Sequence, residues 1–127
     1  MNISFDFDGC LRDSKYVQMI CKLFLSSEHN VFILTQRDSS LSNKDVFKLA
    51  EKIGLKNENI IMTNGDSKLN SFLKYNIDLH FDDSADEVLE INNHFKKSDN
   101  PFIKNESQPA ILVNFDSEEF SFLVNFN

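Results

Sequence analysis

Short apolar runs alternate with amphipathic segments through residues 1–97 of the chain. This alternation is typical of βα units that stack into a parallel sheet. Four of the runs are predicted to be strands, at residues 3–8, 31–35, 59–63 and 78–82. We therefore expect an α/β protein with a Rossmann-like fold, in which helices and a mainly parallel central sheet form a three-layer sandwich.

The segments between these runs carry apolar residues at helical spacing and are predicted to be the covering helices. The first helix is expected around Tyr16. The second is expected to end at Gly54, because glycine commonly terminates helices. A third should begin near Asp66, and a fourth at Ser84, where Ser84 and Glu87 have the spacing of a capping box.

The pattern changes after residue 97. Residues 98–108 are polar and include Pro101, and they are expected to form a connection. The apolar runs 110–115 and 120–126 flank residues 116–119 in the manner of a C-terminal β-hairpin. With 127 residues, 41% of them hydrophobic, and no linker or repeat, the chain is expected to be a single domain covering residues 1–127.

Charge and cysteine content narrow the classes of function. The formal net charge of −7 argues against broad nucleic-acid binding through a basic surface. No segment has the roughly 20 apolar residues of a membrane span, and the N-terminus lacks signal-peptide features, so a soluble, cytoplasmic protein without a membrane partner is expected. Cys10 and Cys21 have neither the spacing of a zinc site nor that of a disulfide framework.

Two carboxylates end the first predicted strand. Asp6 and Asp8 are two residues apart, so in extended backbone both would point to the same side, and Gly9 permits a sharp exit. Proximity to Asp6 is expected to raise the pKa of Asp8. Two like charges held together favour a bound cation.

Further polar residues follow other predicted strands. Thr35 ends the second strand, Asp82 and Asp83 end the fourth, and Lys68 opens the helix after the third. Since the carboxyl ends of parallel strands meet at one edge, these groups are expected to converge there. Lys74 is a weaker candidate than Lys68, because six helical residues would carry it roughly 9 Å from that edge.

Four short segments resemble, in order, the four motifs of the haloacid dehalogenase-like (HAD) superfamily. They are residues 6–11 (DFDGCL), residues 33–35 (ILT), Lys68 and residues 80–83 (HFDD). The resemblance spans roughly residues 1–97 and implies a compact, capless, Mg²⁺-dependent phosphatase with an aspartyl-phosphate intermediate. An Asp at the second position of the first motif resembles the phosphatases of the superfamily rather than its ion pumps or dehalogenases.

The resemblance also implies roles for single residues. Asp6 would attack phosphorus, and Asp8 would protonate the leaving oxygen and then activate water. Thr35 and Lys68 would complete the catalytic set by holding phosphate oxygens. The implied Mg²⁺ ligands are Asp6, Asp8, Asp82 and Asp83. The implied substrate-binding residues are Gly9, Thr35, Gln36, Arg37 and Lys68. These roles agree with the chemistry of phosphoryl transfer, in which a hard cation and hydrogen-bond donors offset the charge on the equatorial oxygens.

Three other interpretations are less well supported. A response-regulator receiver would have its acidic pair on the first strand and its lysine on the last, whereas here an Asp-Asp pair ends the last predicted strand of the alternating region. A cysteine phosphatase would need a C-x5-R loop that begins at Cys10, and the sequence has no such loop there. A catalytically silent HAD-like binding module would be expected to lack part of the catalytic set. His80 is expected to pack within the sheet.

The predicted substrate follows from the lack of room for a cap. The intervals 11–30 and 38–63 are filled by the predicted helices and strands. An open site suits a macromolecular phosphate, such as a nucleic-acid 3′ end or a phosphoprotein, or a small substrate enclosed by a second subunit of a homo-oligomer. The acidic charge favours a small phosphate ester such as a nucleotide or sugar phosphate.

Overall fold

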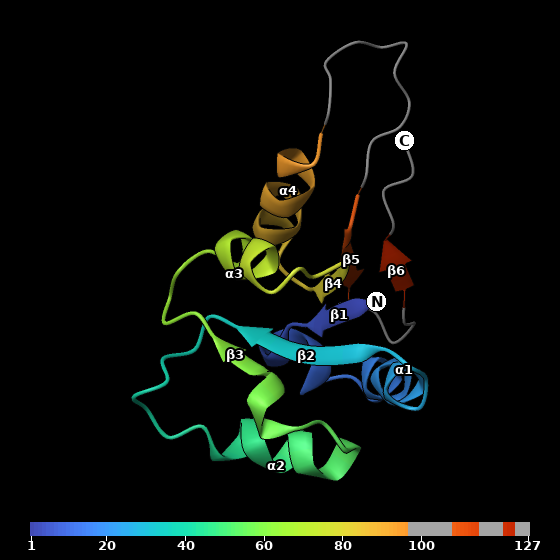
Figure 1. Ribbon diagram of the computed structural model, residues 1–127, viewed down its shortest axis with the longest axis vertical. Helices are drawn as coiled ribbons and strands as arrows, with labels where there is room; N and C mark the ends of the chain where they lie inside the picture. The colour runs from blue at the N-terminus through green and yellow to red at the C-terminus, as the bar shows by residue number, and fades with distance from the viewer. Residues whose placement is uncertain (97–107, 115–120, 124–127) are drawn as a thin grey trace.

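The computed structural model describes residues 1–96, 108–114 and 121–123, and the strands in these ranges form one sheet (Figure 1). The strand order is β3-β2-β1-β4-β5-β6. The first five strands in this order are parallel to one another, which confirms the α/β class and the Rossmann-like arrangement. The strands are β1 (Asn2–Phe5), β2 (Asn30–Thr35), β3 (Ile60–Met62), β4 (Leu79–Asp82), β5 (Ala110–Asn114) and β6 (Ser121–Leu123).

Helices pack against the sheet in two separate apolar clusters. Residues of α1 (Lys15–Leu25) and α2 (Lys44–Ile53) share one cluster with alternate residues of β1 and β2. Residues of α3 (Lys68–Lys74) and α4 (Ala85–His94) form the second cluster with Ala110 of β5. Figure 1 shows these two pairs of helices on opposite sides of β1 and β2. Short helical turns lie at Phe7–Leu11 and Asn57–Asn59.

The central strands are buried because helices cover both faces of the sheet. Ile3 and Phe5 are fully buried in the cluster with α1 and α2, and the Phe5 ring stacks on Phe81 of β4 at 4.8 Å. Ser4, between them in sequence, is also fully buried. Period-2 alternation places Ser4 on the opposite face of the sheet, toward α3 and α4.

The first strand is shorter than predicted. β1 ends at Phe5, and the chain then turns through residues 7–11 instead of staying extended to Asp8. The backbone N–H of Leu11 donates to the carbonyl of Asp6 at 3.1 Å, which closes this turn. Asp6 and Asp8 therefore do not lie on one pleated strand.

Two helix ends follow the sequence prediction, one of them only in part. Gly54 ends α2 with φ of 86°, and Ser84 is the N-cap of α4, where its hydroxyl accepts from the N–H of Glu87. The predicted capping box is only half formed. The N–H of Ser84 donates to Asp82 Oδ1 at 3.0 Å, which leaves the Glu87 carboxylate to bind elsewhere.

The C-terminal part extends the sheet beyond β4. β5 pairs with β4 in parallel and with β6 in antiparallel orientation, with Leu112 opposite Leu123. The predicted connection at 98–108 lies almost entirely outside the described residues, and the predicted turn at 116–119 lies wholly outside them. The hairpin as a unit therefore stays a prediction. Within the described ranges, no helix is long and apolar enough to cross a membrane.

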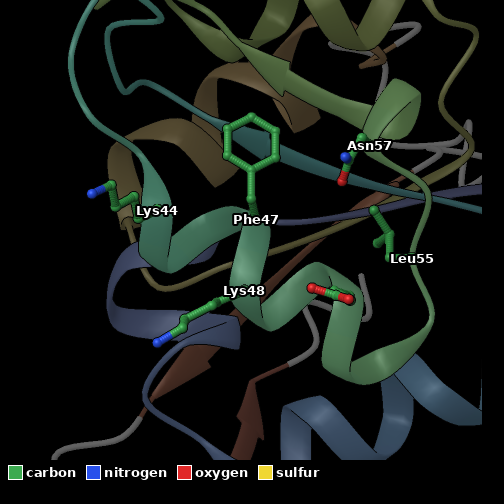
Figure 2. A pocket seen from close by; sticks show the side chains of 6 residues that line it. Lys44, Phe47, Lys48, Leu55 and Asn57 are labelled. Carbon is green, nitrogen blue, oxygen red and sulfur yellow. The ribbon is translucent and has the colours of Figure 1, made fainter.

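A pocket of about 730 Å³ opens beside α2 (Figure 2). It is lined by Lys44, Phe47, Lys48, Glu51, Leu55 and Asn57. None of the site residues predicted from the sequence belongs to this lining. The residues expected to meet at the sheet edge therefore lie outside this pocket.

Candidate functional site

A second cavity, of about 370 Å³, lies where β1, β2 and β4 end. Its lining is Asp6, Asp8, Thr35, Gln36, Arg37, Lys68, Asp82, Asp83, Ser84 and Glu87. Every site residue predicted from the sequence except Gly9 is in this group. Topology accounts for the convergence, because neighbouring parallel strands present their carboxyl ends at the same edge of the sheet.

The Lys68 side chain bridges two buried carboxyl groups in this cavity. Its Nζ atom lies 2.7 Å from Asp6 Oδ1 and 2.6 Å from Asp82 Oδ2. Burial lowers the pKa of Lys68, but the charges of Asp82 and Asp6 outweigh this, and the net shift is upward. The group is therefore an ammonium ion at neutral pH. Lys74 is instead exposed, with its Nζ over the Tyr75 ring.

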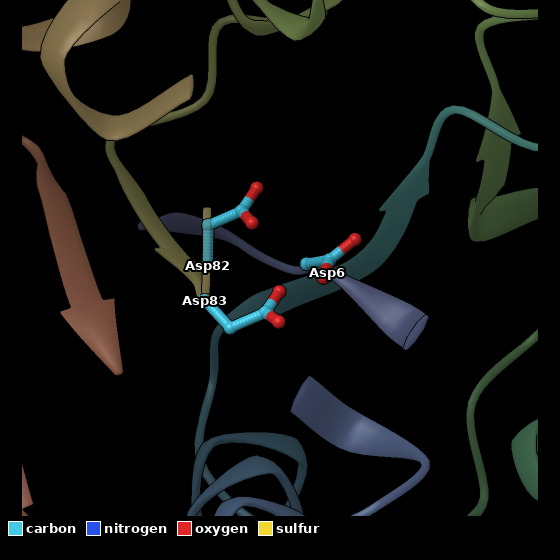
Figure 3. A group of neighbouring side chains, drawn as sticks. All are labelled: Asp6, Asp82 and Asp83. Carbon is cyan, nitrogen blue, oxygen red and sulfur yellow. The ribbon is translucent and has the colours of Figure 1, made fainter. Parts of the chain in front are cut away.

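Three carboxylates form an acidic cluster beside Lys68, and we call Asp6, Asp82 and Asp83 the carboxylate cluster. One oxygen of each lies within 4.8 Å of the others, and Figure 3 shows the side chains grouped where β1 and β4 end. Carboxylate oxygens are the donors that Mg²⁺ prefers. The donor set therefore fits a hard divalent cation.

The two buried members of the cluster differ in protonation. Burial and the charge of Asp82 raise the pKa of Asp6 to about 8, despite the opposing charge of Lys68. Burial also acts to raise the pKa of Asp82, but hydrogen bonding to His80 and the charge of Lys68 prevail and lower it to about 2. Without a cation, Asp6 therefore holds a proton at neutral pH while Asp82 is ionised.

Asp8 lies apart from the carboxylate cluster. Its carboxylate accepts from Arg37 Nε at 2.8 Å and Nη2 at 2.7 Å, and from Arg12 Nη1 at 2.8 Å. The hydrogen bonds from Arg37, together with the charges of both arginines, lower the pKa of Asp8. The expected upward shift was wrong, because the turn after Phe5 directs this side chain to the arginines. That Asp8 is a metal ligand stays a prediction, and both of its carboxylate oxygens accept from guanidinium groups.

Arg37 lines the cavity, but protein carboxylates occupy most of its donors. It donates to both oxygens of Asp8 and to both oxygens of Asp45, the latter at 2.6 and 2.8 Å. Its guanidinium carbon also lies 4.9 Å from the centre of the Phe7 ring. Most of its N–H donors are thus used, so Arg37 is better placed to hold Asp8 than to bind substrate.

Gly9 allows Asp83 to approach the first motif. Its φ is 72°, and its N–H donates to Asp13 Oδ2 at 2.7 Å. A Cβ atom built on Gly9 would lie 2.1 Å from Asp83 Oδ2. The need for glycine here is therefore steric, and the N–H expected to bind substrate already has a protein partner.

Thr35 and Gln36 lie at the end of β2. Thr35 is buried, and its Oγ1 accepts weakly from the N–H of Arg37 at 3.4 Å. The side-chain amide of Gln36 donates to Glu87 Oε1, and Glu87 Oε2 accepts from the N–H of Lys68 at 3.2 Å. Glu87 thus connects the first turn of α4 to the end of β2 and the start of α3.

Sequence reasoning missed Glu87 and Ser84 as residues of the cavity. Both were interpreted only as helix-capping residues. The available signal was their position, since the first turn of a helix that follows Asp82 must begin at the same sheet edge.

His80 is fully buried, as expected for a residue that packs within the sheet. Its Nε2 atom lies 2.8 Å from Asp82 Oδ2, and its Nδ1 atom lies 2.6 Å from Ser4 Oγ. Burial lowers the pKa of His80, so the ring is neutral at pH 7. The buried ring is thus in direct contact with a member of the carboxylate cluster.

Neither the protein-family models, nor the curated proteins, nor the solved structures that were compared with this chain gave a match. What the cavity can do is therefore inferred from its own groups. Three clustered carboxylates can bind a cation, while an ammonium ion and a hydroxyl can bind the oxygens of an anion.

Proposed function

We propose that this protein is a Mg²⁺-dependent phosphohydrolase of the HAD type that cleaves a phosphate monoester through an aspartyl-phosphate on Asp6. The observation that carries the proposal is the contact of Lys68 with both Asp6 and Asp82, at 2.7 and 2.6 Å, beside a third carboxylate from Asp83. These groups come from three separate segments, which occur in the order of the HAD motifs.

The carboxylate cluster would hold the metal ion. When bound there, Mg²⁺ would offset the repulsion between the phosphate and the Asp6 carboxylate and would polarise a phosphate oxygen. The substrate phosphate would lie at the mouth of the cavity, where the Thr35 hydroxyl and the Lys68 ammonium can reach its oxygens.

In the first step, an Asp6 oxygen attacks phosphorus and the bond from phosphorus to the leaving oxygen breaks. Asp6 must be ionised to attack, and the ammonium of Lys68 at 2.7 Å favours that ionised form. Negative charge that develops on the phosphoryl oxygens is stabilised by the same ammonium and by the Thr35 hydroxyl. A proton on Asp8 passes to the leaving oxygen, so the step yields a mixed anhydride on Asp6, the free alcohol and the ionised Asp8 carboxylate.

In the second step, Asp8 takes a proton from water, which attacks phosphorus and releases phosphate with regeneration of the Asp6 carboxylate. The ionised form that Arg37 and Arg12 stabilise is the form required for this role. Protonation of the leaving alcohol in the first step requires Asp8 to carry a proton against the influence of these arginines. Asp8 therefore serves more readily as base than as acid in this arrangement.

The walls of the cavity favour a polar substrate. Every side chain in its lining is polar or charged among the residues that the structure describes. A small phosphate ester such as a sugar phosphate suits these walls, and a nucleotide would have to place its base outside the cavity.

We further propose a cytoplasmic, single-domain protein with a three-layer sandwich and a C-terminal hairpin.

The decisive experiment measures hydrolysis of an aryl phosphate by the purified protein with Mg²⁺, with chelator, and as the Asp6→Asn variant. Activity is expected only in the first case, and acid-quenched reactions should contain phosphoprotein. Asp86→Asn is the matched control, since this exposed residue of α4 lies outside the cavity lining. Strong turnover by Asp6→Asn would exclude the covalent route.

A substrate panel then separates the alternatives. It should include sugar phosphates, nucleotides, 3′-phosphorylated oligonucleotides and a phosphoprotein. Preference for a small ester supports the proposal, and turnover of a macromolecular phosphate alone would replace it. Binding of Mg²⁺ and phosphate without any turnover would indicate an HAD-like binding module.

A further inference from the structure

Ser4, His80 and Asp82 form a continuous buried chain of hydrogen bonds toward the carboxylate cluster. Ser4 of β1 and His80 of β4 are direct partners in the parallel register, and Asp82 is two residues after His80 on the same strand. All three side chains are fully buried. Period-2 alternation and strand pairing therefore place them in one row on the face of the sheet that α3 and α4 cover.

The direction of each hydrogen bond follows from the chemistry of the partners. Lys68 donates to Asp82 Oδ2 and the N–H of Ser84 donates to Asp82 Oδ1, so both oxygens are acceptors and His80 Nε2 must carry the proton that it donates across 2.8 Å. The neutral ring then has an unprotonated Nδ1, which accepts from the Ser4 hydroxyl across 2.6 Å. Asp82 thus selects the ring tautomer, and Ser4 supports that tautomer and the ring orientation by donating to Nδ1.

Asp82 is held at both oxygens. Oδ2 accepts from His80 and Lys68, and Oδ1 accepts from the N–H of Ser84 at 3.0 Å. Lys68 also contacts Asp6 and is expected to contact phosphate, so its position depends on the state of the site. Among the described residues, the His80 side chain hydrogen-bonds only to Ser4 and Asp82, so its contact with Oδ2 is independent of substrate.

We infer that His80, supported from its other side by Ser4, is a positioning residue that orients the Asp82 carboxylate for divalent-cation binding at the carboxylate cluster. This inference rests on the proposed function. Groups that hold a metal ligand typically change metal affinity or activity by about 10–100-fold when removed. A purely structural role accounts less well for Ser4 and His80. Two apolar side chains would fill the same space without the desolvation cost of buried polar groups.

The test measures the affinity of the full chain for Mg²⁺ alone by isothermal titration calorimetry. His80→Leu keeps a similar volume but removes the donor, and it should weaken Mg²⁺ binding by about 10–100-fold. His80→Gln can place its amide N–H near the position of Nε2, and it should bind closer to wild type than to His80→Leu. Ser4→Ala should lie between wild type and His80→Leu, because the His80 ring keeps its contact with Asp82 but loses the hydrogen bond at Nδ1 that helps to hold its orientation.

Asn92→Leu is the matched control for lost stability. Asn92 is also buried, and its side-chain amide hydrogen-bonds to the carbonyl and the N–H of Ala110. This variant should unfold at lower temperature and keep wild-type affinity for Mg²⁺. Equal weakening of binding in Asn92→Leu and His80→Leu would overturn the inference, since the effect would then come from stability.

The remaining outcomes separate the inference from the proposed function. Wild-type affinity in His80→Leu, or failure of His80→Gln to improve on it, overturns the positioning role while the proposed function stands. Failure of wild type to bind Mg²⁺ overturns both. If His80→Leu does not fold, Ser4→Ala and His80→Gln are compared with wild type instead. Weaker Mg²⁺ binding in Ser4→Ala than in wild type then supports the inference. Unchanged Mg²⁺ binding in Ser4→Ala overturns it.

Discussion

The side chain of Asp83 occupies the space that a Cβ atom on Gly9 would need. A Cβ atom at that position would lie 2.1 Å from Asp83 Oδ2. Gly9 also has a positive φ of 72°. The first of these features is steric and the second conformational, so the two costs of a larger side chain can be separated by experiment. Gly54 provides the comparison, because its φ is 86° but no atom lies within 4 Å of its Cβ position.

Gly9→Ala is predicted to displace Asp83 and to weaken Mg²⁺ binding as well as stability. Gly54→Ala should cost about 1–2 kcal/mol of unfolding free energy, from the backbone conformation alone, and should leave Mg²⁺ affinity unchanged. Urea unfolding and Mg²⁺ titration of both variants check this. Equal losses of stability in the two variants, with intact Mg²⁺ binding in Gly9→Ala, would contradict the prediction. The Asp83 side chain would then move aside without any effect on metal binding.

Removal of the Lys68 ammonium is predicted to be strongly destabilising. Lys68→Met leaves Asp6 and Asp82 buried and close to each other without a cation, and the loss of one partner from a buried ion pair typically costs about 3–5 kcal/mol. Lys74→Met, on the same helix but exposed, should change stability by no more than about 0.5 kcal/mol. Urea unfolding of the metal-free variants at pH 7 measures both.

Comparable stability of Lys68→Met and wild type would contradict the prediction, since it would mean that the carboxylates are hydrated or far apart in solution. Phosphatase activity provides a second measurement. It should be abolished in Lys68→Met and retained in Lys74→Met.

The fold and the membership of the cavity could be predicted from the sequence because both depend on periodicity. Apolar runs alternate with amphipathic segments, and parallel strands bring their carboxyl ends to one edge. Thr35, Lys68 and Asp82 therefore meet although 47 positions separate the first from the last in the numbering. Lys74 was correctly placed away from this edge by helix geometry alone.

The contacts of single side chains could not be predicted in the same way. The orientation of Asp8 depends on where β1 ends, and strand ends are set by local turns rather than by periodicity. Arg37 and Asp45 come from a different segment, so nothing near Asp8 in sequence indicates the pairing. The Glu87 side chain does not cap α4, because the N–H of Ser84 donates to Asp82 Oδ1 instead.

Arg37→Met is predicted to raise the pKa of Asp8, because it removes the hydrogen bonds that contribute most to the present downward shift. A larger fraction of Asp8 would then carry a proton near neutral pH. Hydrolysis of an alkyl phosphate needs a proton on the leaving oxygen, so its decline at high pH should move to higher pH in this variant. Rates measured against pH for an alkyl and an aryl phosphate test this.

The aryl phosphate should respond less, because its leaving group departs more easily without a proton. Lys48→Met is the matched control, since Lys48 is an exposed cation of α2 outside the site cavity. The same high-pH decline in Arg37→Met and wild type would show that Asp8 is not the proton donor.

The pKa of Asp6 leads to a prediction for stability against pH in the absence of metal. The folded protein binds a proton at Asp6 up to about pH 8, whereas the ordinary pKa of the group is 3.8. Between these values the folded state holds more protons than the unfolded state, so this carboxyl makes the folded protein progressively less stable as pH rises from about 4 to 8. Asp6→Asn removes this single contribution and leaves the other titrating groups in place.

The melting temperature of Asp6→Asn relative to wild type, both in chelator, should therefore increase from pH 5 to pH 8 and level off above that. Asp82 does not interfere, because its pKa of about 2 places its own effect below pH 4. His80 contributes to both proteins alike, and Asp86→Asn should follow wild type throughout. A constant difference between Asp6→Asn and wild type from pH 5 to pH 8 would mean that Asp6 is already ionised in acid. In that case the Lys68 ammonium, rather than a proton, would balance the Asp6 charge, and Mg²⁺ binding would release no proton near neutral pH.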